Sequence, residues 1–232
     1  MRRSIDVPRT SIKLAGVMLA AGLAAAACGT VKMGAAAILG DQRITSSTLS
    51  AQVSDLNTSY QANKTKVQLQ FPASEMPQVV LGWMVRFQVR DRLAERQNVS
   101  VTPADVQKAL NSITAQIRQG GNTATLSQVA VANGLPPDML NDLGRYQAIE
   151  TKLLNRLDSG KLPTQSSAQQ ELQTQFTTSE CRAAKSLDIK INPQFGLLDY
   201  SDYAVVAAPS TLSKPAAAAS PTATPKQTTP HC

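Results

Sequence analysis

Histidine is scarce and phosphate-binding loops are missing in this chain, and each shortage excludes a class of function. Aromatic side chains are scarce as well, which restricts how a core can be built. A single histidine, His231, occurs in 232 residues, and hydrolytic devices that pair a serine or cysteine with histidine need that ring held in place. No cluster of His, Cys, Asp or Glu has metal-ligand spacing, and no glycine-rich loop follows a strand as phosphate binding requires. We therefore expect no catalytic residue, no metal and no cofactor.

The composition favours helices and a modest positive charge. Aromatic residues make up 4% of the chain against 42% for all hydrophobic residues, so a core has to be built from aliphatic side chains and Met. The formal net charge is +7, but four basic residues and one acidic residue lie in the first 13, which leaves +4 for the remainder. This balance suits an anionic membrane surface, and no block of basic residues indicates nucleic acid.

The first residues have the pattern of a secretory leader. Arg2, Arg3, Arg9 and Lys13 form a basic region, and residues 14–27 form an uncharged run of about 14 residues, which is typical of a signal peptide and short for a membrane-spanning helix. The residues after the arginine pair do not fit twin-arginine export, so we expect the general secretory route. A leader of this kind places the mature protein outside the cytoplasm.

A cysteine follows the leader and indicates lipid anchoring. The small residues before Cys28 resemble a bacterial lipobox, which predicts cleavage before Cys28 and attachment of lipid to its sulfur, although Ala25 stands where Leu is usual. The alternative is ordinary signal cleavage after Ala27, which leaves a free thiol. Lipidation would hold the protein at the outer face of the bacterial cytoplasmic membrane.

The segment after the anchor predicts a hairpin, a helix and an ambiguous stretch. Residues 35–39 and 42–45 flank a Gly-Asp turn and read as a hairpin. Ser46 or Ser47 is expected to cap a helix that runs to about Tyr60. Between residues 63 and 77, apolar and polar residues alternate in a way that fits either a short strand or an extended loop.

The longest predicted helix spans about residues 78–97. Its apolar arc is wide, which predicts burial against more than one neighbour. Arg86, Arg90, Arg92 and Arg96 occupy the remaining face. We interpret this face as solvated, and a basic surface for membranes or acidic clients is the alternative.

The corner RQNVSVTPADV joins this helix to the next one. Asn98 can adopt the left-handed conformation that ends a helix. Thr102 and Asp105 form a capping box around Pro103 at the first helical position, and two valines between the helices are expected to hold the corner on a core. The second helix should end at Gly120.

The remaining chain predicts further helices, one strand and a tail. A short helix should begin at Thr123 or Thr125, and a longer one should begin near Pro136 and continue to about Ser159. A polar helix is expected from Thr164 to about Thr178. Residues 187–192 alternate as a strand, whose best partner is the hairpin at residues 35–45. From Pro209 the composition of Ala, Pro, Thr, Ser and Lys predicts disorder.

These elements resemble the SurA N-terminal-like domain, the chaperone part of SurA-type peptidyl-prolyl isomerases. The resemblance covers about residues 35–195 and depends most on the RQNVSVTPADV corner and on the INPQFG ending. It implies a mostly α fold, a SurA N-terminal-like helical bundle with a small β element that pairs the N-terminal hairpin with the C-terminal strand. The chain would then consist of a signal peptide (1–27), a lipidated tether (28–34), the helical domain (35–200) and the tail (209–232).

The resemblance also implies that the domain binds unfolded or exported polypeptides. About 30 residues separate Leu157 from Leu187, far fewer than a parvulin isomerase domain needs, so isomerase activity is not expected. An adaptor that binds one folded envelope partner is the alternative function. The side chains predicted to contact a client, with core packing as their alternative role, are Phe71, Met76, Trp83, Met84, Phe87, Met139 and Tyr146.

Two cysteines besides Cys28 fit an oxidising compartment. Cys181 and Cys232 can form a disulfide there. The alternative is that they do not pair, because Cys232 ends the tail. Asp138 and Asp142 lie near a helix start, where capping explains them better than acid–base catalysis.

Overall fold

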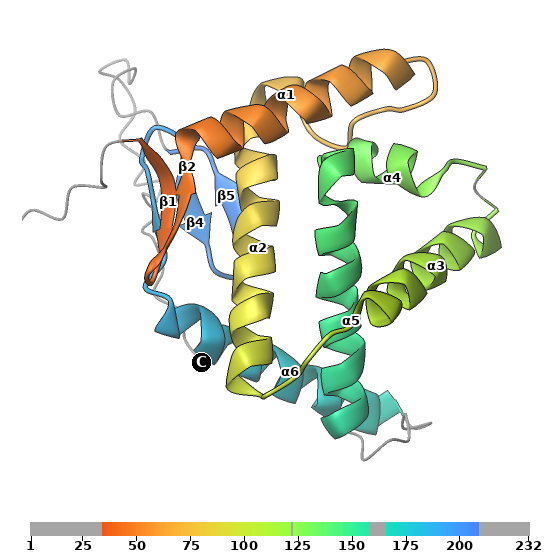
Figure 1. Ribbon diagram of the computed structural model, residues 1–232, viewed down its shortest axis with the longest axis vertical. Coiled ribbons are helices and arrows are strands. Elements are labelled where there is room, and N and C mark those ends of the chain that lie inside the picture. Colours follow the sequence, from red (N-terminus) through yellow and green to blue (C-terminus); the bar gives the residue numbers. More distant parts are fainter. Residues whose placement is uncertain (1–33, 122, 158–165, 209–232) are drawn as a thin grey trace, which may run out of the picture. The chain divides into compact units, whose positions relative to one another are not determined.

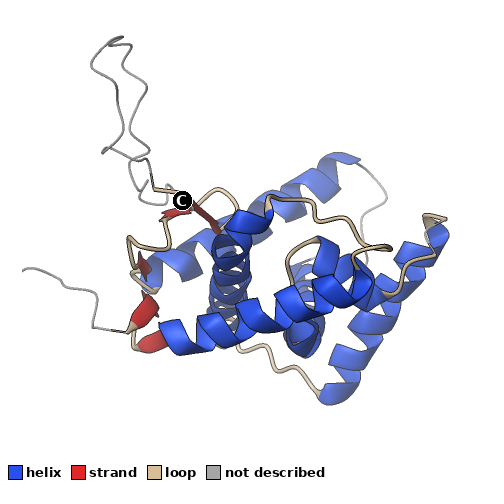
Figure 2. Ribbon diagram, turned by 90° about the horizontal axis from the view of Figure 1, so that it is seen from above, coloured by secondary structure: helices blue, strands red, loops and turns tan. Residues whose placement is uncertain are grey.

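The computed structural model describes residues 34–121, 123–157 and 166–208, and these residues are mostly helical with a small antiparallel sheet (Figure 1). All of them fall within one compact unit. The strands gather at one side, and helices make up the rest (Figure 2). The helices are α1 (Ser46–Asn63), α2 (Met76–Arg96), α3 (Pro103–Gln119), α4 (Leu126–Ala132), α5 (Leu140–Leu157) and α6 (Ser166–Ser186). The predicted class, mostly α with a small β element, is confirmed at this level.

A three-stranded sheet brings the start of the described chain next to the segment that follows α6. Its order is β2 (Gln42–Thr45), β1 (Ala35–Leu39) and β3 (Lys190–Ile191). The hairpin turns at Gly40, whose φ of 62° is easily reached without a side chain. Asn192 donates from its backbone to Ala36 and from its side chain to Ala35, both at 2.9 Å. The predicted pairing of the hairpin with the late strand is therefore confirmed.

The N-cap of helix α1 lies one residue before the first of the two predicted positions. Thr45, rather than Ser46 or Ser47, is the N-cap, and its Oγ1 accepts a hydrogen bond from the Thr48 backbone at 3.0 Å. The residues between α1 and α2 form no strand. They run as an extended loop, in which the Gln70 backbone donates to Ala132 at 2.8 Å, and end in a short 3₁₀ turn at Ala73–Glu75.

Helix α2 is the centre of the packing. It contacts α1, α5, α6 and the last strand, which agrees with its wide apolar arc. Val80, Leu81, Val85, Val89 and Leu93 are fully buried along it.

The corner after α2 follows the prediction closely. Asn98 has a φ of 50°, and the Thr102–Asp105 capping box is formed in both directions. Val99 is buried together with Leu93 and Ile149, and Val101 packs against the same cluster. Helix α3 crosses α5 at Gly144, where an added Cβ would lie 2.8 Å from side-chain carbons of Val106 and Leu110.

The C-terminal part of the fold differs from the prediction. Helix α6 continues to Ser186, well past Thr178, because Ala183 and Ala184 are buried. A further hairpin, β4 (Leu197–Asp199) with β5 (Ala204–Val206), extends the domain beyond residue 200. It packs on α2 at Gly82, where an added Cβ would lie 3.4 Å from the Val205 backbone nitrogen.

Several predictions concern parts of the chain outside the described residues. These are the signal peptide, Cys28 with most of the tether, the tail from Pro209, and Cys232. They stay predictions.

Candidate functional site

Five of the seven predicted client-contact residues come together in one cluster. Trp83, Met84 and Phe87 of α2 meet Met139 of the 3₁₀ turn Pro137–Met139 and Tyr146 of α5. The Phe87 ring lies 5.8 Å from both the Trp83 and the Tyr146 ring centroids. Phe87 and Met139 are only 7% and 6% exposed. Core packing therefore accounts for these two side chains.

Trp83 is half-buried and fixed by polar contacts. Its Nε1 donates to the Asn133 carbonyl at 3.0 Å, and the Arg86 guanidinium lies 5.0 Å from its ring centroid. Arg86 also donates to the Asp202 carbonyl at 2.8 Å, which attaches the β4–β5 turn to α2. The indole thus joins α2 to the end of α4 and has little freedom to adapt to a client.

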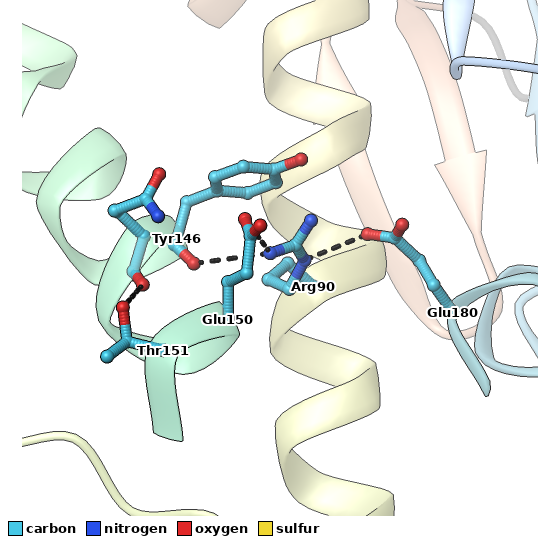
Figure 3. A network of polar contacts seen from close by, with 6 residues as sticks. Arg90, Tyr146, Glu150, Thr151 and Glu180 are labelled. Atoms are coloured by element: carbon cyan, nitrogen blue, oxygen red, sulfur yellow. Dashed lines mark hydrogen bonds and ion pairs between the residues drawn. The ribbon is translucent and has the colours of Figure 1, made fainter. Parts of the chain in front are cut away.

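Next to this cluster, Arg90 forms a buried polar network that the sequence did not reveal (Figure 3). Arg90 is 2% exposed, so its predicted place on a solvated face is wrong. Its Nε donates to Glu180 of α6 at 2.8 Å, and its Nη1 donates to Glu150 of α5 at 3.0 Å. The guanidinium carbon lies 3.8 Å from the Tyr146 ring centroid and 4.7 Å from that of Phe176.

The electrostatics of this network indicate a structural role. Burial opposes the charge of Arg90, but Glu180, Tyr146 and Glu150 outweigh it and raise the pKa of the guanidinium above its usual value. Burial also raises the pKa of the Tyr146 hydroxyl. Arg90 therefore stays charged and Tyr146 stays protonated at neutral pH, so neither group is suited to proton transfer there. The network fastens α2, α5 and α6 together.

An open groove lies along α1, on another part of the domain from the aromatic cluster. We call it the α1 groove, and it encloses about 460 Å³. It is lined by α1, by the residues that lead into α2, and by the turn after β3: Leu49, Ser50, Val53, Ser54, Asn57, Ala73, Ser74, Met76, Pro77 and Phe195. The lining combines apolar side chains with three serines and one asparagine, and none of these residues carries a charge. Met76 is the predicted contact residue that belongs to this groove; Phe71 packs nearby against the main core.

The turn after β3 holds Phe195 in the groove wall. The Asn192 side chain accepts from the Gln194 backbone at 3.2 Å, and the Asn192 carbonyl accepts from the Phe195 backbone at 2.9 Å. Gly196 follows with a φ of 129° and lies so close to the Val206 carbonyl that a Cβ would clash. The INPQFG segment thus places an aromatic ring at the groove, a role that the sequence did not disclose.

A second open pocket is less suited to apolar ligands. It encloses about 550 Å³ between the end of α3 and the start of α4, and Arg118 and three threonines are among its lining residues. Asn122, which lies in the same loop, is outside the described residues.

Three further observations concern metal binding, membrane spans and a disulfide in the described residues. No group of three or more His, Cys, Asp or Glu residues there is placed to hold a metal ion. Within the same residues, no helix combines the length and the apolar character needed to cross a membrane. Cys181 is disulfide-bonded; Cys28 and Cys232 both lie outside the described residues, so its predicted pairing with Cys232 stays a prediction.

Comparison of this chain with protein families, with curated proteins and with solved structures gives no match.

Proposed function

We propose that this protein is an exported, lipid-anchored lipoprotein whose helical domain binds apolar segments of unfolded or newly exported polypeptides without catalysing a reaction on them. The observation that carries the proposal is the α1 groove. The domain would act as a SurA N-terminal-like chaperone module that lacks an isomerase domain.

The size and lining of the groove fit a short piece of polypeptide. Its volume of about 460 Å³ falls within the range of ligand pockets, roughly 300–1,000 Å³. Val53 and Phe195 offer partly exposed apolar surface, and the nearly buried Leu49 and Met76 complete the apolar part of the lining.

The rim of the groove suits the backbone of an extended segment. An unfolded chain carries unpaired N–H and C=O groups, which are costly to bury without partners. Ser50, Ser54 and Asn57 are exposed along α1 and provide uncharged donors and acceptors. A lining without charge favours apolar clients over acidic or basic ones.

The leader supports a location outside the cytoplasm. Cleavage before Cys28 and lipidation of its sulfur would attach the domain to the outer face of the bacterial cytoplasmic membrane through a short tether. Incorporation of labelled palmitate into the wild-type chain but not into Cys28→Ser tests this part. Equal labelling of both chains would exclude Cys28 as the lipid site.

An aggregation assay tests the proposed binding function. The chain from Thr30 onward is mixed with a chemically unfolded model protein, and light scattering is followed after dilution of the denaturant. We expect the wild-type chain and Ala62→Trp to suppress scattering, and Ser54→Trp, which fills the groove, to lose most of this effect. Both positions are exposed on α1, but Ala62 lies outside the groove lining. The absence of suppression at several-fold molar excess would refute the proposal.

The adaptor alternative is favoured by one observation, the burial of Met76, Phe87 and Met139. Their burial leaves less apolar surface for varied clients than the sequence predicted. Crosslinking in cells from a probe at Asn57 separates the two functions. Many crosslinked clients support the chaperone function, and one stoichiometric partner supports the adaptor.

A further inference from the structure

The β4–β5 hairpin ends next to the segment that contributes Phe195 to the α1 groove. Leu197 pairs with Val206 and Asp199 with Ala204 in an antiparallel register. The pairing ends at Val206, and Ala208, the last described residue, follows two residues later. Gly196 is the neighbour of Phe195, which lines the groove, and it approaches the Val206 carbonyl closely, so the described chain ends within a few residues of the groove lining.

From this geometry we infer that the groove takes the segment Pro209–Ala219 of its own chain as an intramolecular ligand, with Leu212 as the buried side chain. Leu212 is the fourth residue after Ala208, and four residues of extended chain span about 13 Å. A groove of about 460 Å³ beside Phe195 lies within this reach.

The chemistry of the segment matches that of the groove. Leu212 is the one large aliphatic side chain between residues 209 and 232, and its neighbours are Pro, Ser, Thr and Ala with a single Lys. An uncharged groove with an apolar floor and hydroxyl groups at its rim suits such a segment. The prolines reduce the entropy that is lost when the segment becomes ordered.

Tethering makes this ligand a competitor for any foreign segment. A short flexible connection gives an effective concentration on the order of millimolar. A client would therefore have to displace the segment, so that the protein binds strong clients and ignores weak ones.

Photo-crosslinking of the full chain tests the inference. The Asn57→benzoylphenylalanine variant places the probe at an exposed position of the groove lining. After irradiation and digestion, we expect intrachain crosslinks to residues 209–219. They should be lost in Leu212→Asp and kept in Thr211→Asp, which adds the same charge but keeps the leucine. Crosslinks between two copies, or none to residues 209–219, would overturn the inference.

A titration with a labelled peptide keeps this inference separate from the proposed function. The probe is a fluorescein-labelled decapeptide of Leu, Phe, Ser and Gly. We expect Leu212→Asp to lower its Kd about threefold or more relative to Thr211→Asp, because a tethered competitor is removed. Crosslinks to the segment without any peptide binding would uphold the inference and refute the proposed function. An equal Kd in the two variants would overturn the inference and leave the proposed function standing.

Discussion

At the scale of single residues, Arg90 is the side chain on which the packing of three helices depends. It is the one charged residue that is fully buried in the described part of the chain. Removing a guanidinium from water costs several kcal/mol, which is recovered when carboxylates and hydrogen bonds surround it closely. Glu150, Glu180 and two aromatic ring faces provide that environment.

Arg90→Met should therefore lower the free energy of unfolding by about 3–5 kcal/mol, because it leaves two carboxylates largely buried without a partner. Urea unfolding measures this change. Arg96→Met is the matched control on the same helix, since Arg96 is exposed and its replacement should change stability by less than about 0.5 kcal/mol. Equal effects of the two substitutions would show that the network contributes nothing.

Asp105 predicts a pH dependence of stability. Hydrogen bonds from Lys152 and from the backbone and side chain of Thr102 hold the pKa of its carboxyl well below the usual value. A depressed folded-state pKa contributes stability above the unfolded-state pKa of about 3.9, and this contribution disappears as the pH falls toward the folded-state pKa. Asp105→Asn should thus lower the thermal midpoint at pH 7, and the difference from wild type should shrink below about pH 4. A difference that stays constant down to pH 2 would contradict this explanation.

The sequence could not have singled out Arg90. Arg86, Arg92 and Arg96 lie on the same helix with similar spacing, and the partners of Arg90 are 60 and 90 residues away in the chain. Burial of one arginine depends on how α5 and α6 pack on α2, which no local pattern encodes. The capping box of Asp105 is the opposite case, because Thr102 is three residues away and the box follows from local geometry. The ion pair of Asp105 with Lys152 is again a distant contact that no local pattern encodes.

At the scale of elements, Gly144 sets the distance between α3 and α5. Gly144→Ala should destabilise the protein by about 1–3 kcal/mol, since the new Cβ would lie 2.8 Å from Val106 and Leu110 carbons and 3.1 Å from the Val106 carbonyl oxygen. Alanine favours helices over glycine by about 0.5–1 kcal/mol, so a net loss means that the clash dominates.

Gly120→Ala is the control for this substitution, measured by the same denaturant unfolding. Gly120 has a φ of −73°, and an added Cβ would meet its neighbours at an ordinary 3.6 Å. Its replacement should be nearly neutral. A stabilising effect of Gly144→Ala would show that α3 can move away from α5 without cost.

Elements with strong local signals were predicted, and those held by distant contacts were not. The corner between α2 and α3 contains both the residue that ends α2, Asn98, and the capping box that begins α3. The β4–β5 hairpin has strands of three residues and a turn in which Tyr203 adopts a φ of 57°, an unusual conformation for tyrosine. Its stability comes from packing on α2, as the burial of Leu198, Tyr203 and Val205 in the main core indicates.

At the scale of the whole described unit, β1 pairs with β3, so that two segments far apart in the sequence meet beside α2. The alternating pattern of residues 187–192 predicted this pairing, because a lone strand needs a partner. The α1 groove could not be predicted in the same way. It depends on Leu49, Met76 and Phe195 meeting from three separate segments, and each of these residues reads locally as an ordinary core residue.

Binding of a labelled apolar decapeptide, followed by fluorescence anisotropy, tests the central claim most directly. The titration compares the wild-type chain, Ser54→Trp and Ala62→Trp, each with and without Leu212→Asp. We predict saturable binding for the wild type and Ala62→Trp, and a Kd at least about tenfold higher for Ser54→Trp, which corresponds to about 1.4 kcal/mol. The same affinity for all three chains, or no binding by any of them, would contradict the assignment of the α1 groove as a polypeptide-binding site.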